Sequence, residues 1–252
     1  MKTIFQILFS FLVWTFSFVW MALLALATFL VLPIAPYRKS SRWITIPGFA
    51  LIAKTVTFGK FRVIYDRKFD PERRSVFCQN HVNLLDAHSA ATAIHHPFCG
   101  VMHAWQFKIP FYGWLMTLSK GIAVPKRQFK KDTVSQIIQM AKERKKEGFS
   151  ILVFPEGGRT LTGKVQKFHR GIFFIARDAG YPVVPVAVRG MYEVNRKGSW
   201  LFSPGDVSVY VGPQFETEGL SDEKINELTA QMQGIVARFV ETGEIPHEGE
   251  PL

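Results

Sequence analysis

The chain has 252 residues, 48% of them hydrophobic, which is enough for one α/β domain with a large core plus an appendage. Its 31 lysines and arginines outnumber its 20 aspartates and glutamates, and the resulting net charge of +11 favours anionic lipid surfaces, acidic carrier proteins or phosphorylated ligands. The cations are spread along the chain without any nucleic-acid-binding motif, so we expect no nucleic-acid partner.

The chain opens with a long apolar segment. No charged residue occurs from Thr3 to Tyr37, and because a membrane helix needs about 20 such residues, the segment can cross a bilayer or lie deep in one leaflet. A cleaved signal peptide ending near Ala25 to Ala27 is the alternative, but its apolar run would exceed the usual ~7–15 residues. Arg38, Lys39 and Arg42 follow at once, which predicts a membrane protein whose following domain faces the cytoplasm.

A second apolar stretch runs from Trp43 to Phe58 and is interrupted by Pro47 and Gly48. This pattern predicts an interfacial helix that returns along the membrane. We therefore expect an N-terminal hydrophobic, membrane-associated helical element over residues 1–58 and an α/β domain over residues 59–252. The sequence leaves open whether the first element is a single span, a hairpin or a pair of helices lying on the surface.

A histidine and an aspartate follow the short apolar run from Val76 to Cys78. The run predicts a buried strand and Leu84 to Ala93 a helix, so His81 falls in the turn at the carboxyl end of the strand. Asp86 can then accept a hydrogen bond from one ring nitrogen of His81 and leave the other free to take a proton from a hydroxyl. Turn histidines and helix N-terminal aspartates also occur for capping alone, so the pair needs a second signal.

Other reactive residues lie near this pair: His88, Ser89, His95, His96, Cys78 and Cys99. The histidines show no recognised ligand spacing, so we interpret them as surface residues of a helix and expect no metal site. Ser89 lacks the strand-to-helix elbow of a nucleophilic serine. Two cysteines outside any metal spacing are typical of a protein in a reducing cytoplasm.

The second signal is the segment from Ile151 to Thr160, an apolar strand followed by a glycine turn that carries Glu156 and Arg159. Paired glycines let backbone amides approach an anion, and arginine binds phosphate through two parallel hydrogen bonds. Arg170 precedes a helix expected from Gly171, whose N-terminus would add positive charge. A hairpin turn with a solvated basic face is the alternative interpretation.

The remaining elements alternate between strands and helices. The expected strands are Phe61 to Tyr65, Val183 to Val188 and Asp206 to Val211, and the expected helices are Asp132 to Glu147, closed by Gly148, and one capped by Ser221. That last helix should bury Ile225, Leu228, Met232, Ile235, Val236 and Phe239, and residues 244–252 should form a tail. The alternation predicts an α/β sheet whose loops build the site.

From Phe61 to Val211 the chain resembles the lysophosphatidic acid acyltransferases, the PlsC-like group of glycerolipid enzymes. The family's histidine, four residues and aspartate match His81 and Asp86. Its Phe-Pro-Glu-Gly-Thr-Arg-Ser-like string matches the segment from Phe154 to Thr160, and its proline-containing strand matches Val183 to Val188. The chain departs from the family where Lys126 and Arg127 replace an Asp-Arg pair, and where His103 to Gln106 replaces a Lys-Lys-Glu-like string.

The resemblance implies a mixed α/β sheet flanked by helices, preceded by a two-helix N-terminal element. It also implies an acyltransferase that moves a fatty acyl group from the thioester of acyl-CoA or acyl-carrier protein to a lysophospholipid hydroxyl, giving phosphatidic acid from 1-acylglycerol-3-phosphate. His81, oriented by Asp86, would remove the hydroxyl proton without a covalent acyl-enzyme, and no cofactor is expected. The expected substrate-binding residues are Lys126, Arg127, Glu156, Gly157, Gly158, Arg159, Thr160 and Arg170, with Glu156 positioning Arg159 or the acceptor. Anionic membrane lipid is a further expected partner.

Three other functions stay open at this point. The replacement at His103 allows an acyltransferase for another lysolipid, for example one that contains an amino acid. A lipid hydrolase would use water in place of the lysolipid and release free fatty acid without an acceptor. A membrane-anchored lipid-binding protein would have a silent site, against which the intact His81, Asp86, Glu156 and Arg159 argue.

Overall fold

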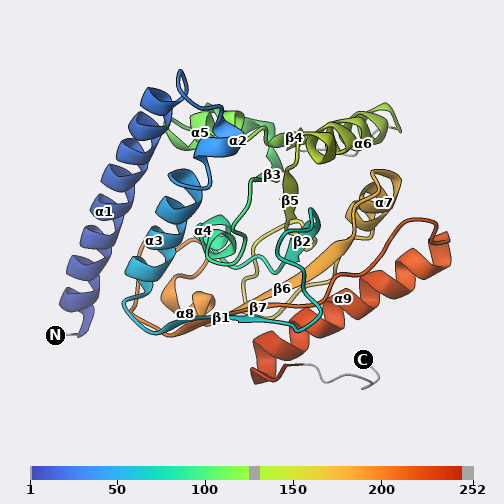
Figure 1. The fold of residues 1–252 in the computed structure, drawn as a ribbon. Helices are drawn as coiled ribbons and strands as arrows, with labels where there is room; N and C mark the ends of the chain where they lie inside the picture. Colours follow the sequence, from blue (N-terminus) through green and yellow to red (C-terminus); the bar gives the residue numbers. More distant parts are fainter. Residues whose placement is uncertain (1, 125–130, 246–252) are drawn as a thin grey trace.

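The computed structural model describes residues 2–124 and 131–245, which form a seven-stranded sheet with helices on both faces (Figure 1). Its strands are β1 (Phe61–Tyr65), β2 (Val76–Gln79), β3 (Phe98–His103), β4 (Ile122–Val124), β5 (Ser150–Val153), β6 (Val183–Arg189) and β7 (Val207–Val211). Its α-helices are α1 (Lys2–Val31), α2 (Tyr37–Ser40), α3 (Thr45–Thr57), α4 (Asp86–Ala91), α5 (Tyr112–Leu118), α6 (Lys131–Lys146), α7 (Gly171–Asp178), α8 (Met191–Val194) and α9 (Asp222–Thr242), and a 3₁₀ helix, η1, spans Ala104–Lys108.

The strand order places two loops of the chain side by side. Across the sheet the order is β1-β7-β6-β2-β5-β3-β4, and every neighbouring pair is parallel except β6 and β7. The expected mixed sheet is therefore confirmed. Strands β2 and β5 pair in parallel, with Cys78 opposite Val153, so the loops that follow them leave from the same edge of the sheet. We call them the histidine loop, which follows β2 and carries His81, and the glycine turn, which follows β5 and carries Gly157 and Gly158.

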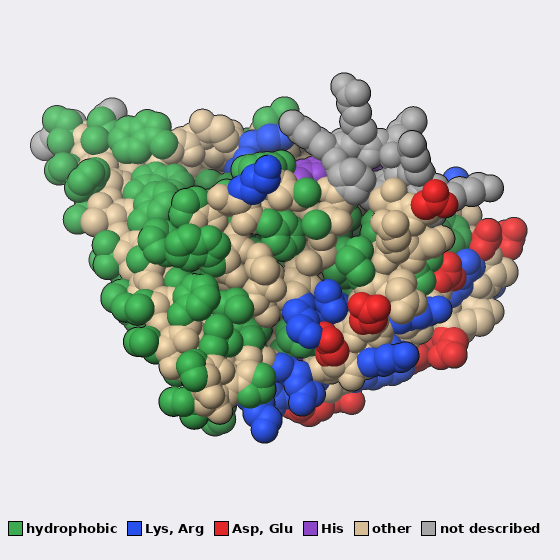
Figure 2. Space-filling model, turned by 90° about the horizontal axis from the view of Figure 1, so that it is seen from above, with side chains coloured by type: hydrophobic (Ala, Val, Ile, Leu, Met, Phe, Trp, Pro, Cys, Tyr) green, Lys and Arg blue, Asp and Glu red, His purple; other side chains and the backbone are tan. Residues whose placement is uncertain are grey.

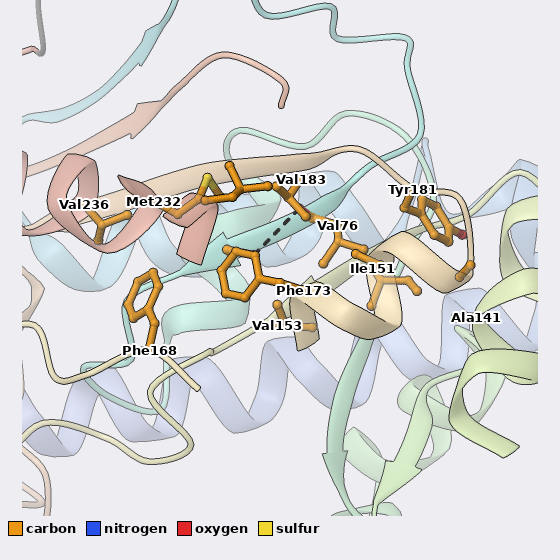
Figure 3. Close-up of a cluster of buried hydrophobic side chains, with 14 of the residues drawn as sticks. Val76, Ala141, Ile151, Val153, Phe168, Phe173, Tyr181, Val183, Met232 and Val236 are labelled. Carbon is orange, nitrogen blue, oxygen red and sulfur yellow. Dashed lines mark hydrogen bonds between the residues drawn. The ribbon is translucent and has the colours of Figure 1, made fainter. Parts of the chain in front are cut away.

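One face of the sheet is covered by helices from the C-terminal half of the chain (Figure 3). Phe173 of α7 and Met232 and Val236 of α9 point toward the strands. They pack on the β-branched side chains of Val76, Ile151 and Val183, which belong to β2, β5 and β6 and are fully buried. All six apolar residues expected on the inner side of α9 are buried, and Ser221 caps that helix by accepting from the Lys224 N–H.

The helix expected near Trp43 to Phe58 is present as α3, but its apolar side does not face lipid. Ile52 and Val56 are buried in the same cluster as Phe77 of β2, because α3 packs against α4. The interfacial prediction is therefore wrong for most of this helix. Pro47 lies in its first turn, where a proline removes no helical hydrogen bond, so the helix is not interrupted.

Helix α1 lies along the outside of the domain and packs against α3 (Figure 1). Gly48 of α3 sits directly against Leu24 of α1, where any side chain would collide with the leucine. Figure 2 shows hydrophobic side chains gathered along this edge, with acidic and basic side chains over the opposite part of the visible face. The exposed large hydrophobic side chains of α1 are Ile4, Phe5, Ile7, Leu8, Phe11, Leu12, Phe18, Val19, Leu23, Leu26, Phe29 and Leu30. The helix is long and apolar enough to cross a membrane.

Candidate active site

His81 and Asp86 meet in the loop between β2 and α4, as expected. His81 Nδ1 lies 2.6 Å from Asp86 Oδ2, and the same oxygen accepts the backbone N–H groups of Val82 at 2.6 Å and Asn83 at 3.1 Å. The imidazole stacks on the ring of Phe154, with centroids 4.2 Å apart. Among residues 2–124 and 131–245 nothing bonds His81 Nε2, so this nitrogen is available to a hydroxyl.

Buried polar side chains fix the shape of this loop. Asn80 acts like a strand residue, donating from Nδ2 to the Val188 carbonyl at 2.9 Å and accepting the Val188 N–H at 2.7 Å. Asn83 Nδ2 donates to the carbonyls of Met191 at 2.9 Å and Asn195 at 3.2 Å. Since both asparagines are buried, these bonds tie the histidine loop to β6 and α8 and leave the catalytic pair little freedom.

Glu156 reaches across from the glycine turn to the histidine loop. Its Oε1 accepts the His81 N–H at 2.7 Å, and its Oε2 accepts from the backbone and side chain of Gln166 at 2.9 and 3.2 Å. Burial raises the pKa of Glu156, while the hydrogen bonds from His81 and Gln166 lower it. Among the described residues Glu156 forms no hydrogen bond or ion pair with Arg159. Its bonds position His81, and its expected role of positioning Arg159 or the acceptor stays a prediction.

Thr160 also holds the histidine loop. Its N–H donates to the His81 carbonyl at 2.8 Å, and its hydroxyl accepts the N–H groups of Thr162 and Gly163. The side chain is 2% exposed and is not part of the cavity wall. In the described structure the polar atoms of Thr160 shape the turn, and the expectation that Thr160 also binds substrate stays a prediction. With Glu156, it bonds both backbone groups of His81.

A cavity of about 880 Å³ has the His81–Asp86 pair in its wall. His81, Asp86, Gly157, Gly158 and Arg159 lie on its wall, in agreement with their expected place in the site. The rest of the lining is largely apolar and comes from α3, β3, α5, α6 and α7, including Phe49, Val101, Met116, Ile137 and Ile175. A space of this size and polarity accommodates a hydrocarbon chain next to a reactive head.

The expected basic residues are distributed unevenly. Arg159 lines the cavity, whereas Lys126 and Arg127 lie outside the described residues. Arg170 stands at the N-cap of α7, as expected from the sequence, but is exposed and does not line the cavity. The preceding residue, His169, lies on the cavity wall instead.

Sequence reasoning missed Lys197, which also lines the cavity. It lies in the loop after α8, outside any segment that the motifs mark, and only the fold brings it to the site. His103, at the end of β3, is a second cavity residue, and its Nδ1 is buried without a partner in the described structure. An unpaired nitrogen facing a cavity indicates a position where a ligand or water bonds.

The other reactive residues near the pair are buried. His88 and His96, expected on the surface, are 7% and 2% exposed, and burial lowers the pKa of each to about 4. Both ring nitrogens of the buried His96 are hydrogen-bonded, to the Pro71 carbonyl and to Ser150 Oγ. No cluster of residues that could hold a metal ion occurs among the described residues. Cys78 and Cys99 are also buried, which raises the pKa of both thiols.

Comparison with known proteins agrees with this site. The family model described as Acyltransferase matches residues 60–189, which contain the histidine loop and the glycine turn. The 1-acyl-sn-glycerol-3-phosphate acyltransferase of Pseudomonas aeruginosa is 30% identical over 92% of this chain and 88% of its own length, and that of Saccharomyces cerevisiae is 27% identical over 77% and 64%. The crystal structure of the 1-acyl-sn-glycerophosphate (LPA) acyltransferase PlsC from Thermotoga maritima shares the fold, with a TM-score of 0.79 over 98% of this chain and all of that one, at 24% identity. The chain belongs to the acyltransferase family.

Proposed function

We propose that this acyltransferase esterifies the free hydroxyl of 1-acylglycerol-3-phosphate with a fatty acyl group from an acyl-CoA or acyl-carrier-protein thioester. The observation that carries the proposal is the His81–Asp86 pair in the wall of a large, mostly apolar cavity. The names of the Pseudomonas and yeast relatives support this acceptor. The thioester is a second substrate and no further cofactor is required, since the reaction exchanges one acyl bond for another.

His81 Nε2 takes the proton of the acceptor hydroxyl as its oxygen attacks the thioester carbonyl. Asp86 keeps the imidazole in the tautomer that has its proton on Nδ1 and stabilises the imidazolium that forms. The tetrahedral intermediate collapses with loss of the thiolate, which takes the proton back from His81. No acyl-enzyme is needed, and the buried cysteines support this mechanism.

The negative oxygen of the intermediate needs backbone donors. The amides of His81, Val82 and Asn83 already donate to Glu156 and Asp86, and that of Gly157 donates to the Phe154 carbonyl. The N–H groups of Gly158 and Arg159 have no acceptor among the described residues, and both residues line the cavity. These two amides are therefore our candidates for stabilising the oxyanion.

We also propose that α1 lies within one membrane leaflet and does not cross the bilayer. Gln6 donates to Ser203 Oγ at 2.8 Å, and the Thr28 and Thr45 hydroxyls are 3.5 Å apart, so the helix contacts the domain near both ends. These contacts are 22 residues apart, or about 33 Å along a helix, which is the thickness of the hydrocarbon layer. A crossing helix would therefore draw polar parts of the domain into lipid.

The basic residues after α1 favour the cytoplasmic leaflet for this arrangement. Arg38, Lys39 and Arg42 come 7, 8 and 11 residues after α1 ends at Val31. Anionic lipids are concentrated on the cytoplasmic side, and each cation near such a surface contributes about 1 kcal/mol of attraction. The domain would then face the cytoplasm, where acyl-CoA and acyl-carrier protein occur.

The function is tested with purified protein, labelled acyl donors and a panel of lysolipids. We expect phosphatidic acid from 1-acylglycerol-3-phosphate, and we expect His81→Ala to lower kcat by about 10²–10⁴-fold with little change in donor KM. His95→Ala is the matched control, because His95 is exposed and does not line the cavity. Near-normal turnover by His81→Ala would contradict the mechanism. Transfer only to acceptors without phosphate would contradict the acceptor, as would release of free fatty acid without any transfer.

A further inference from the structure

Two positively charged residues lie on the wall of the cavity. Among the described lining residues, Arg159 and Lys197 are the only lysine or arginine. They come from different segments, yet Lys197 Nζ donates to the Arg159 carbonyl at 3.1 Å. No carboxylate in residues 2–124 or 131–245 forms an ion pair with either of them. Because neither cation has a carboxylate partner, an anion bound beside them would be stabilised by both charges.

The loop that carries Lys197 is held in place by the active site itself. Asn195 Nδ2 donates to the carbonyls of Ser199 and Leu201, both at 3.0 Å, which closes the loop around Lys197. The Asn195 carbonyl accepts from Asn83 of the histidine loop at 3.2 Å. One hydrogen bond, from Asn83 to Asn195, therefore joins the loop of His81 to the loop of Lys197. A cation held in this way keeps a fixed relation to the catalytic base.

The neighbouring cation of the same loop lies elsewhere. The guanidinium of Arg196 lies 5.2 Å from the centre of the Tyr192 ring, and Arg196 is not part of the cavity wall. Of these two adjacent cations, only Lys197 lines the cavity. An anion attracted only by the overall positive charge of the protein would be affected equally by either residue, whereas an anion bound in the cavity depends on Lys197.

We propose that Lys197 is a substrate-binding residue that, together with Arg159, binds the phosphate monoester of the acceptor. The proposal rests on the proposed function and deepens it. A guanidinium offers two parallel donors and an ammonium adds a second positive charge, and this combination suits a dianion with three terminal oxygens. The site should therefore prefer a phosphate monoester to a phosphodiester or an uncharged head group, which present less charge and fewer terminal oxygens.

The experiment compares Lys197→Gln with Arg196→Gln, a matched control that removes the same charge one position away. With 1-acylglycerol-3-phosphate in neutral detergent micelles, Lys197→Gln should raise the acceptor KM about 5–50-fold, as expected for loss of a charge-assisted hydrogen bond. Its donor KM and thermal midpoint should stay near the wild-type values. Lys197→Arg should restore most of the lost affinity, and uncharged 1-acylglycerol should be used equally by wild type and Lys197→Gln.

Three outcomes would overturn the proposal. Equal acceptor KM values for Lys197→Gln and wild type would show that Lys197 does not bind the acceptor. A rise in donor KM alone would assign Lys197 to the phosphates of CoA, and equal effects of both glutamine variants would indicate long-range charge only. Failure of the wild-type enzyme to acylate 1-acylglycerol-3-phosphate would instead refute the proposed function, so the two failures are distinguishable.

Discussion

Glu156→Gln tests the role that the structure gives to this carboxylate. The substitution replaces one of the two acceptor oxygens with an NH₂ group, which lies opposite either the N–H of His81 or the donors of Gln166. Two hydrogen-bond donors then face each other at a buried position, and neither has an acceptor. A buried donor without an acceptor costs about 1–3 kcal/mol, which for a chain of this size lowers the thermal midpoint by roughly 2–10 °C. Because the His81 backbone would shift, kcat should fall about 10–100-fold.

The assay for Glu156→Gln measures kcat, both KM values and the thermal midpoint. A residue that positions His81 changes kcat and stability together and leaves acceptor KM nearly constant. Gln166→Ala is the comparison variant: it removes a partner of Glu156 Oε2 at 3.2 Å and a bond to the Gly158 carbonyl at 2.9 Å but spares the bond to His81, so kcat should fall less than in Glu156→Gln. Unchanged stability with a large rise in acceptor KM would refute the reasoning and show that Glu156 contacts the acceptor.

Two further predictions concern the same site, and a third concerns the buried histidines. Asp86→Asn should lower kcat by about 10²–10⁴-fold with acceptor KM nearly unchanged, because an amide cannot both orient and stabilise the imidazolium, and a small effect on kcat would contradict the pairing. Gly157→Ala should destabilise the protein by about 1–2 kcal/mol at its φ of +70°, whereas Gly158→Ala, with open space around it, should not, as thermal midpoints will show. Burial lowers the pKa of His88 and His96 from 6.5 to about 4, so as the pH falls the unfolded chain binds protons before the folded protein does. The free energy of unfolding should therefore decrease by about 3 kcal/mol per histidine between pH 6.5 and pH 4. His88→Leu should weaken this pH dependence, as measured by unfolding at several pH values.

The sequence was sufficient for the parts of the site that are local in the chain. His81 and Asp86 are five positions apart, and a strand followed by a turn and a helix leaves few ways for them to meet. The helix signals were equally local, as with the Ser221 cap and the positive φ of Gly148 after α6. Short-range rules of this kind depend on backbone geometry, which a few residues determine.

The rest of the site depends on pairings distant in sequence. Glu156 bonds the His81 N–H across 75 positions, a contact that exists only because β2 and β5 are neighbours in the sheet. Lys197 reaches the cavity because β6 and α8 lie beside the histidine loop. The burial of His88 follows from the packing of α3 on α4, where its ring lies 4.6 Å from that of Phe49. No local pattern carries such information.

The same pairings make the apolar N-terminal helix part of the catalytic unit. Trp14 Nε1 donates to the Trp200 carbonyl at 2.8 Å, and Ser10 Oγ accepts the Phe202 N–H at 2.8 Å, so α1 holds the loop that carries Lys197. Asn83 connects the start of that loop to the histidine loop. The helix that we propose to lie in a leaflet therefore also supports the proposed phosphate site from behind. If α1 inserts as proposed, its depth in the leaflet would set the depth at which the acceptor's phosphate is bound, because the exposed apolar side of α1 and the side that holds the Lys197 loop belong to one helix.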